Sequence, residues 1–320
     1  MVTGCTITGN AGTGISLFGS GPLTVASSIL SGNDNGVDAY GPATIANCII
    51  SNNSGLGGNG SDPGTIAISG TAISGNSTGG VYDYDWGSGA RTLTITNSTI
   101  TNNGGKSNGD GGLYAYGGTT TVVNSTIADN GSASSLVGGI YAQSGGGTLV
   151  VHDSTIAGNQ NKGPGGAGIY VSTDTVTLTN TIVAGNINGV APDVYGTVTA
   201  NYCLIGNGTD PYQLLGSGSG NNIVNQEPLL AALGGYGGPT MPDGTAMQTM
   251  PELAGSATID AGSNALALDA GGNALTIDQR GLQRVFDNTV VSGSLSAAVR
   301  SLALVDIAND WASSVSASLP

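Results

Sequence analysis

The first two thirds of the chain consist largely of short runs in which polar and apolar residues alternate. One such run, residues 124–130 (NSTIADN), has eight near-copies, and every copy ends in asparagine. These asparagines follow one another at intervals of 20 to 29 residues: Asn10, Asn33, Asn53, Asn76, Asn103, Asn130, Asn159, Asn186 and Asn207. The residue three places earlier is always apolar: Ile7, Leu30, Ile50, Ile73, Ile100, Ile127, Ile156, Val183 and Leu204. Alternation with a period of two predicts strands whose apolar face is turned inward.

Two further strand patterns lie between successive copies. In one unit they are residues 111–118 (GGLYAYGG) and 119–125 (TTTVVNS). Three short strands per unit, joined by turns, describe one coil of a parallel β-helix, whose coils stack about 4.8 Å apart. Leucine-rich repeats would need a helical or leucine-rich segment, and calcium-binding nonapeptide arrays would need tandem GGxGxD sequences. The sequence therefore predicts an all-β solenoid of about nine or more coils, followed by an irregular C-terminal segment.

Each position of the repeated run has its own expected place in the coil. We expect Ile127 to fill a core column and Ser125 to lie in a column of small residues beside it. Asn130 is expected at a corner with left-handed backbone, which asparagine tolerates. Stacked coils would then form a structural ladder of asparagine side chains.

Composition and charge exclude several other classes. The chain has 57 glycines without a Gly-X-Y period and only 8% charged residues, so it is neither collagen-like nor disordered. A formal net charge of −14 repels phosphate backbones, so we expect no nucleic-acid partner. Three widely spaced cysteines support neither a disulfide framework nor a zinc site. No membrane span or secretion signal is visible, and we expect additional N-terminal coils or domains in a longer chain.

Three ordered motifs follow the repeats: residues 225–240 (NQEPLLAALGGYGGPT), 254–264 (AGSATIDAGSN) and 278–285 (DQRGLQRV). Together with the repeats, they resemble the choice-of-anchor Q group of bacterial surface proteins, which carry right-handed parallel β-helix repeats of the pectin-lyase-like superfold. This resemblance implies a right-handed coil and a secreted or surface-displayed protein. We divide the chain into β-helix repeats (1–218), a family segment packing on or continuing the β-helix (219–290), and a Ser/Ala-rich tail with a short helix (291–320).

A strip of aromatic residues is the strongest candidate for a binding surface. It comprises Tyr82, Tyr114, Tyr141, Tyr170 and Tyr195 at matching places in neighbouring coils, together with Tyr84, Trp86 and Tyr116. Because apolar residues alternate with them, these rings are expected to point outward. Such a strip is suited to stacking against sugar rings of a polysaccharide. The alternative is a tyrosine ladder that only stabilises adjacent strands.

Asp83 and Asp85 lie within this strip, with Arg91 nearby and Asp110 in the next coil. Strict alternation would bury both carboxylates, which is costly for unpaired charges, so we expect the strand to bend after Tyr82 and expose them. The three aspartates are also weak candidates for a calcium site, and calcium is the only cofactor that the sequence suggests.

The favoured function is a non-catalytic extracellular or cell-surface protein whose exposed face binds a polysaccharide or another partner, as an adhesin does. One alternative is a polysaccharide lyase or glycoside hydrolase that uses Asp83, Asp85, Asp110 and Lys106. Another is a structural spacer without a ligand. The clustered aspartates with Gly-His-Gly and Arg-x-Lys typical of pectic hydrolases are absent, and we do not expect His152 to be catalytic. In the DQRG motif, we expect Asp278 and Arg280 to form an ion pair that holds the family segment (219–290) on the rod.

Overall fold

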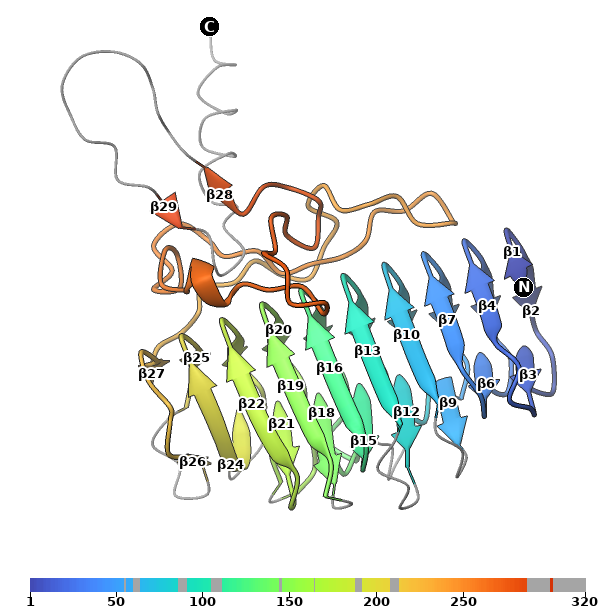
Figure 1. The fold of residues 1–320 in the computed structure, drawn as a ribbon, viewed down its shortest axis with the longest axis horizontal. Coiled ribbons are helices and arrows are strands. Elements are labelled where there is room, and N and C mark those ends of the chain that lie inside the picture. Colours follow the sequence, from blue (N-terminus) through green and yellow to red (C-terminus); the bar gives the residue numbers. More distant parts are fainter. Residues whose placement is uncertain are drawn as a thin grey trace, which may run out of the picture.

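Parallel strands stack along one axis into a rod, with a long irregular segment lying across one side (Figure 1). The computed structural model describes residues 1–54, 56–59, 64–85, 91–104, 111–143, 146–163, 165–187, 192–207, 213–286 and 300–301. Within these ranges the regular structure is almost entirely β, and the one helical element is a short 3-10 turn, η1 (Asn264–Leu266).

One side of the rod is a ten-stranded parallel sheet that takes one strand from each coil. These strands are the repeated runs found in the sequence. They are β2 (Thr6–Thr8), β5 (Ile29–Ser31), β8 (Ile49–Ser51), β11 (Ala72–Ser74), β14 (Thr99–Thr101), β17 (Thr126–Ala128), β20 (Thr155–Ala157), β23 (Ile182–Ala184), β25 (Leu204–Ile205) and β27 (Ile223–Val224). The sheet thus contains one strand more than the nine copies seen in the sequence.

The other strands of the coils form a 17-stranded parallel sheet with two rows. The threonine row is β1 (Val2–Thr3), β4 (Leu23–Ala26), β7 (Ala43–Ala46), β10 (Thr65–Ser69), β13 (Thr92–Thr96), β16 (Thr119–Val123), β19 (Thr148–His152) and β22 (Thr175–Thr179). The tyrosine row is β3 (Ile15–Leu17), β6 (Val37–Ala39), β9 (Leu56–Asn59), β12 (Val81–Tyr84), β15 (Leu113–Tyr116), β18 (Ile140–Gln143) and β21 (Ile169–Val171). The long strand β24 (Val194–Asn201) pairs with both rows and with β26 (Gln213–Leu215).

The core is a column of inward side chains shared by all three rows of strands. Ile127 is completely buried and pairs in register with Ile100 and Ile156, as predicted. The prediction is wrong for the last copy, where Ile205 rather than Leu204 continues the core column. Leu204 pairs with Ile182, on the outer face of the sheet, because the final unit is offset by one residue.

A buried asparagine ladder runs along the corner that follows the ten-stranded sheet. The Nδ2 group of Asn130 donates to the carbonyl of Ile100 at 2.8 Å, and its backbone N–H donates to Oδ1 of Asn159 at 3.0 Å. The predicted ladder is therefore confirmed, but the left-handed residue is not Asn130. It is the preceding Asp129, with φ of 54°, because this turn directs the next side chain inward. The ladder ends where Asn186 bonds to Asp193.

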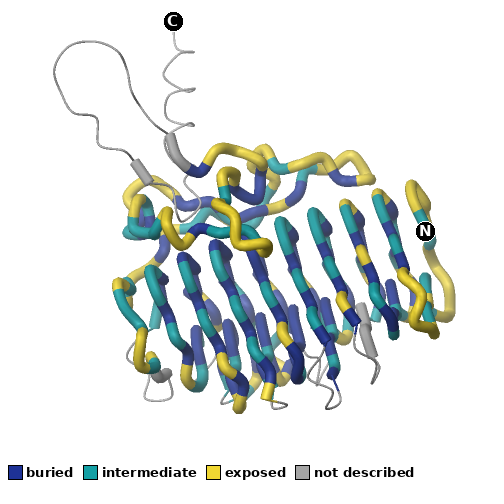
Figure 2. Tube along the Cα trace, in the orientation of Figure 1, coloured by how far each residue is buried: buried dark blue, intermediate teal, exposed yellow. Residues whose placement is uncertain are grey.

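Residues 225–284, here called the C-terminal segment, cover the outer face of the ten-stranded sheet (Figures 1 and 2). Met241 and Met247 pack against Ile49 near one end of the sheet. Near the other end, Leu230 packs against the cluster of Ile182, Ala184 and Leu204. Antiparallel bridges close turns within the segment, such as Ile277 with Gln283.

The side chain of Gln279 anchors this segment at the centre of the sheet. It accepts a hydrogen bond from the Thr126 hydroxyl and donates to the carbonyl of Ser98 and the hydroxyl of Thr99. The predicted ion pair between Asp278 and Arg280 is present. However, Asp278 shapes its own turn by accepting the backbone N–H groups of Arg280 and Leu282, so the contact with the rod comes from Gln279.

Arg284 forms a second anchor, with its Nη2 2.7 Å from Oδ1 of Asp153. After it, β28 (Val285–Phe286) and β29 (Arg300–Ser301) form an antiparallel pair. The rest of the predicted tail at 291–320, including its expected helix, lies outside the described residues.

Candidate functional site

Seven tyrosines form two columns along the outside of the tyrosine row and β24. In the first column, strand pairing places Tyr82, Tyr114, Tyr141, Tyr170 and Tyr195 in register. In the second column, Tyr84 pairs with Tyr116. The alternating residues Val81, Leu113 and Ile140 belong to the core, so the tyrosines point outward, as the pattern predicts. We call these seven residues the tyrosine face.

The rings of the tyrosine face pack against one another. Tyr82 stacks on Tyr114 with ring centroids 4.4 Å apart and an interplanar angle of 10°, and Tyr84 stacks on Tyr116 at 4.5 Å and 23°. Tyr141 turns its plane 89° from that of Tyr114, at a centroid distance of 5.3 Å. The contacts continue through Tyr170 to Tyr195 at 4.9 and 5.0 Å.

This packing decides which atoms of the tyrosines are accessible. Tyr114 is only 8% exposed, since rings surround it and its hydroxyl bonds to Oε1 of Gln143. The other six tyrosines are partly exposed. Where the rings stack almost in parallel, their faces contact each other, and ring edges and hydroxyls are left to meet a ligand.

Glycines make the tight corner after the second column. Gly117 follows Tyr116 with φ of +69°, and a Cβ there would lie 2.8 Å from the carbonyl oxygen of Asp85. The close approach of successive coils at this corner therefore requires a residue without a side chain.

A second aromatic pair, not identified from the sequence, lies at the same corner, two and three coils before Tyr84. Phe18 stacks on Tyr40 with centroids 5.2 Å apart, and Phe18 is 79% exposed. These residues follow β3 and β6 directly, in the sequences ISLFGSG and VDAYGPA. The sequence could have indicated this pair, because in both places an aromatic residue at the end of a strand is followed by glycine, as in Tyr116–Gly117.

Asp83 and Asp85 do not occupy the exposed position that we expected. Each is 2% exposed, because the strand does not bend after Tyr82 and the alternation continues through Tyr84. Arg91, itself 1% exposed, forms an ion pair with Asp83 and supplies the counter-charge that makes burial tolerable. Asp85 accepts the backbone N–H of Arg91 at 3.2 Å. Burial raises the pKa of Asp83, although the guanidinium of Arg91 opposes this rise.

The remaining candidates for catalysis or metal binding are not brought together in the described part of the chain. Trp86, Lys106 and Asp110 lie outside the described residues. His152 ends β19, where its Nδ1 lies 3.5 Å from Asp153. Among the described residues, no group of three or more His, Cys, Asp or Glu side chains is placed to hold a metal ion.

Basic side chains on the described surface are scarce. Arg91, Arg280 and Arg284 are all buried and take part in ion pairs with aspartates. Lys162 is the one lysine within the described ranges, and it is exposed in a loop. Among the lysine and arginine side chains whose burial the structure describes, Lys162 is therefore the one exposed cation that could attract a polyanion.

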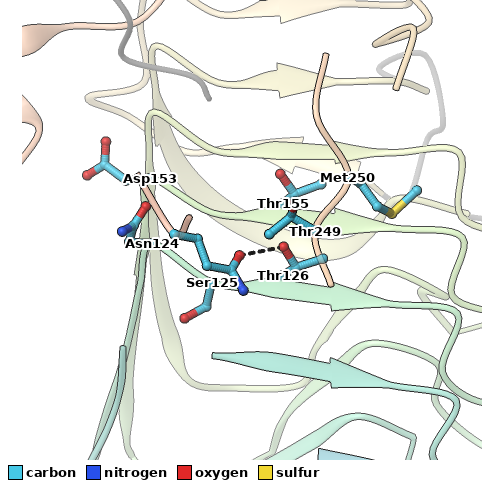
Figure 3. A pocket seen from close by; sticks show the side chains of 8 residues that line it. Asn124, Ser125, Thr126, Asp153, Thr155, Thr249 and Met250 are labelled. Atoms are coloured by element: carbon cyan, nitrogen blue, oxygen red, sulfur yellow. Dashed lines mark hydrogen bonds between the residues drawn. The ribbon is translucent and has the colours of Figure 1, made fainter. Parts of the chain in front are cut away.

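A small cavity lies in the seam between the C-terminal segment and the ten-stranded sheet (Figure 3). Its volume is about 10 Å³, and its lining includes Asn124, Thr126, Asp153 and Thr249. That is about the size of one water molecule and far too small for a substrate. The seam thus serves to attach the segment.

The stacked coils define the class of protein as a parallel β-helix. Comparison with known families matches residues 1–92 and 64–227 to the family described as "Right handed beta helix region". The chain belongs to this family, which confirms the predicted all-β, right-handed parallel β-helix fold.

Two further comparisons complete this result. No curated protein matches the chain. Among solved structures, the crystal structure of pectate lyase Pel9A is similar, with a TM-score of 0.49 and 15% sequence identity over 94% of this chain and 88% of that one. A similarity this distant transfers no activity. Within the described ranges, no helix has the length and apolarity that a membrane span requires.

Proposed function

We propose that the protein is a non-catalytic β-helix whose tyrosine face binds a polysaccharide, outside the cell or on its surface. The observation that carries this proposal is the continuous outward surface of tyrosines contributed by consecutive strands from β12 to β24. Tyrosine combines a large apolar ring with a hydroxyl that forms hydrogen bonds, which suits the mixed apolar and hydroxylated surface of a sugar chain.

The catalytic alternative has weaker support. A lyase or glycoside hydrolase needs carboxylates or a base that reach the substrate, whereas Asp83 and Asp85 are buried and Asp83 is held by Arg91. The spacer alternative uses the same stacking for another purpose, because cross-strand aromatic pairs also stabilise a sheet. A binding experiment separates these alternatives.

The resemblance of the C-terminal motifs to choice-of-anchor Q proteins supports the surface location in a bacterium. This part of the proposal has its own test: treatment of intact producing cells with protease, followed by immunodetection of the chain. Loss of the signal from intact cells supports display on the surface. Protection of the signal until the cells are lysed would contradict surface display.

Affinity electrophoresis tests the binding function directly. The wild-type chain is run through gels that contain hydroxyethylcellulose, xylan, glucomannan or polygalacturonate, beside a Tyr141→Ala/Tyr170→Ala variant. Tyr236→Ala is the matched control, because Tyr236 is an exposed tyrosine on the C-terminal segment. We expect one or more polymers to retard the wild type and the control but not the double variant.

Each other result has a distinct meaning. If no polymer retards any of the three proteins, glycan binding to these polymers is contradicted and the spacer is favoured. Equal retardation of the wild type and the double variant would place binding elsewhere on the molecule. A zone of cleared polymer around the wild-type band would mean that the protein cleaves the polymer and would support the enzyme alternative.

A further inference from the structure

Phe18 is the most exposed aromatic ring that the structure describes among those in stacking contacts, although its partner Tyr40 is half-buried. One exposed ring is ordinary on a protein surface, so exposure alone indicates nothing. The position of the pair is informative because strand register connects it with the tyrosine face.

The register of the tyrosine row places both aromatic groups along one line. Asp38 pairs with Gly57, and Gly57 pairs with Tyr82, so Asp38 extends the first tyrosine column towards β3. Two residues beyond Asp38, Tyr40 extends the second column in the same way, because successive outward residues of a strand are two apart. Only β9 lies between the two groups, so they are about 10 Å apart along the rod.

Glycine occupies the intervening position of the first column. Gly57, in register with both Asp38 and Tyr82, adds no side chain between them. From β3 to β24 the combined surface extends over seven strand spacings, about 34 Å. This length suits an extended polymer better than a single sugar.

Asp38 adds a polar group to the same surface. It is half-buried, and burial raises the pKa of its carboxyl, while the charge of Arg91 opposes this rise. Its carboxylate can accept hydrogen bonds from sugar hydroxyls. A uronic acid at the same place would set two carboxylates against each other, and like charges at short distance repel.

We propose that Phe18, Tyr40 and Asp38 form a second contact patch for the same polysaccharide, which lies along the rod axis and consists of uncharged sugars. This inference rests on the proposed glycan-binding function and adds the direction, length and chemical class of the ligand. Because Phe18 and Tyr40 stack on each other between adjacent coils, they offer ring edges and the Tyr40 hydroxyl to the polymer, as the tyrosine face does, and Asp38 accepts hydroxyl groups.

The test compares three single variants of the whole chain with the wild type, by affinity electrophoresis in hydroxyethylcellulose, xylan, glucomannan and polygalacturonate. Phe18→Ala removes the exposed ring, and Leu253→Ala is the matched control, since Leu253 is an exposed apolar residue on the C-terminal segment. Asp38→Asn keeps the size and a hydrogen-bonding group but removes the charge. Circular dichroism verifies that each variant is folded.

We expect Phe18→Ala to weaken binding of the uncharged polymers by up to about tenfold, which is the effect of losing one good aromatic contact. Leu253→Ala should bind as the wild type does. Asp38→Asn should reduce the preference for uncharged polymers over polygalacturonate.

The two proposals fail in different ways. If Phe18→Ala binds as the wild type does while Tyr141→Ala/Tyr170→Ala loses binding, the second patch is refuted and the proposed function stands. Tighter wild-type binding of polygalacturonate than of every uncharged polymer would refute the ligand class. If none of the polymers retards the wild type, the glycan-binding function and this extension both fail for them.

Discussion

The outer face of the ten-stranded sheet and the tyrosine face are both built from outward residues of the same coils, yet one is covered and the other is open. Thr99, Thr126 and Leu204 point away from the core and are nevertheless at most 3% exposed, because the C-terminal segment lies over them. Most of the tyrosines, by contrast, remain partly exposed. Figure 2 shows the covering segment along one side only.

The difference between the two faces follows from side-chain size. The covered sheet presents mainly short side chains, such as Thr126 and Ala128, over which another segment of chain can approach closely and form specific hydrogen bonds. On the tyrosine face, large rings cover each other and leave edges and hydroxyls at the surface. A position that points outward in a solenoid is therefore not necessarily exposed.

The largest effect is expected from Gln279→Ala on the covered face. The substitution removes the hydrogen bonds with Thr126, Ser98 and Thr99 and leaves their buried polar groups without this partner. We expect a loss of about 2–4 kcal/mol in the free energy that docks the C-terminal segment. Hydrogen exchange of residues 225–284 measures it, and Gln283→Ala is the control because Gln283 is exposed on the same turn. Equal protection of the segment in the two variants would refute the anchoring role of Gln279.

A smaller effect is expected from Tyr170→Ala on the open face. The substitution removes the ring contacts of Tyr170 with Tyr141 and Tyr195, and these lie on the face that the C-terminal segment does not cover. We expect about 1 kcal/mol less stability in chemical denaturation and unchanged hydrogen exchange of residues 225–284. Faster exchange in that segment would show that the two faces are coupled and would contradict their independence.

The smallest effect concerns Asp129, at the corner that follows the covered sheet. Burial raises its pKa above the ordinary value of 3.8, so the folded chain binds this proton more tightly than the unfolded chain does. The stability contributed by the protonated form is present below that ordinary value and is lost as the pH rises through the folded-state pKa. Asp129→Asn removes this dependence and keeps the left-handed backbone, as Asn52 and Asn102 do at equivalent corners.

Denaturation of the wild type and Asp129→Asn at two pH values measures this effect. Near pH 3 the two proteins should be about equally stable, and near pH 7 the variant should be more stable by less than about 1 kcal/mol, because solvent screens a partly exposed charge. A wild type that gains stability over the variant as the pH rises would contradict the assigned direction.

Much of the fold could be predicted because it repeats. Nine similar runs indicated the coils, the core column through Ile127 and the asparagine ladder, since each depends on local alternation and identical neighbours. The prediction of Leu204 in the core was wrong because the last unit departs from the repeat. The candidate site was predicted less completely: the tyrosine columns followed from alternation, whereas Phe18 and Tyr40 were missed.

The sequence by itself determined the parallel β-helix, the inward and outward positions of each strand, and the alignment of tyrosines in neighbouring coils. These features follow from a period of two within strands and from repetition between coils. Only the tertiary structure decided which outward face the C-terminal segment covers, that Arg91 neutralises the buried Asp83, and that Phe18 and Asp38 extend the tyrosine face. The physical reason is that each of these depends on contacts between residues in different strands, coils or segments, which no local pattern specifies.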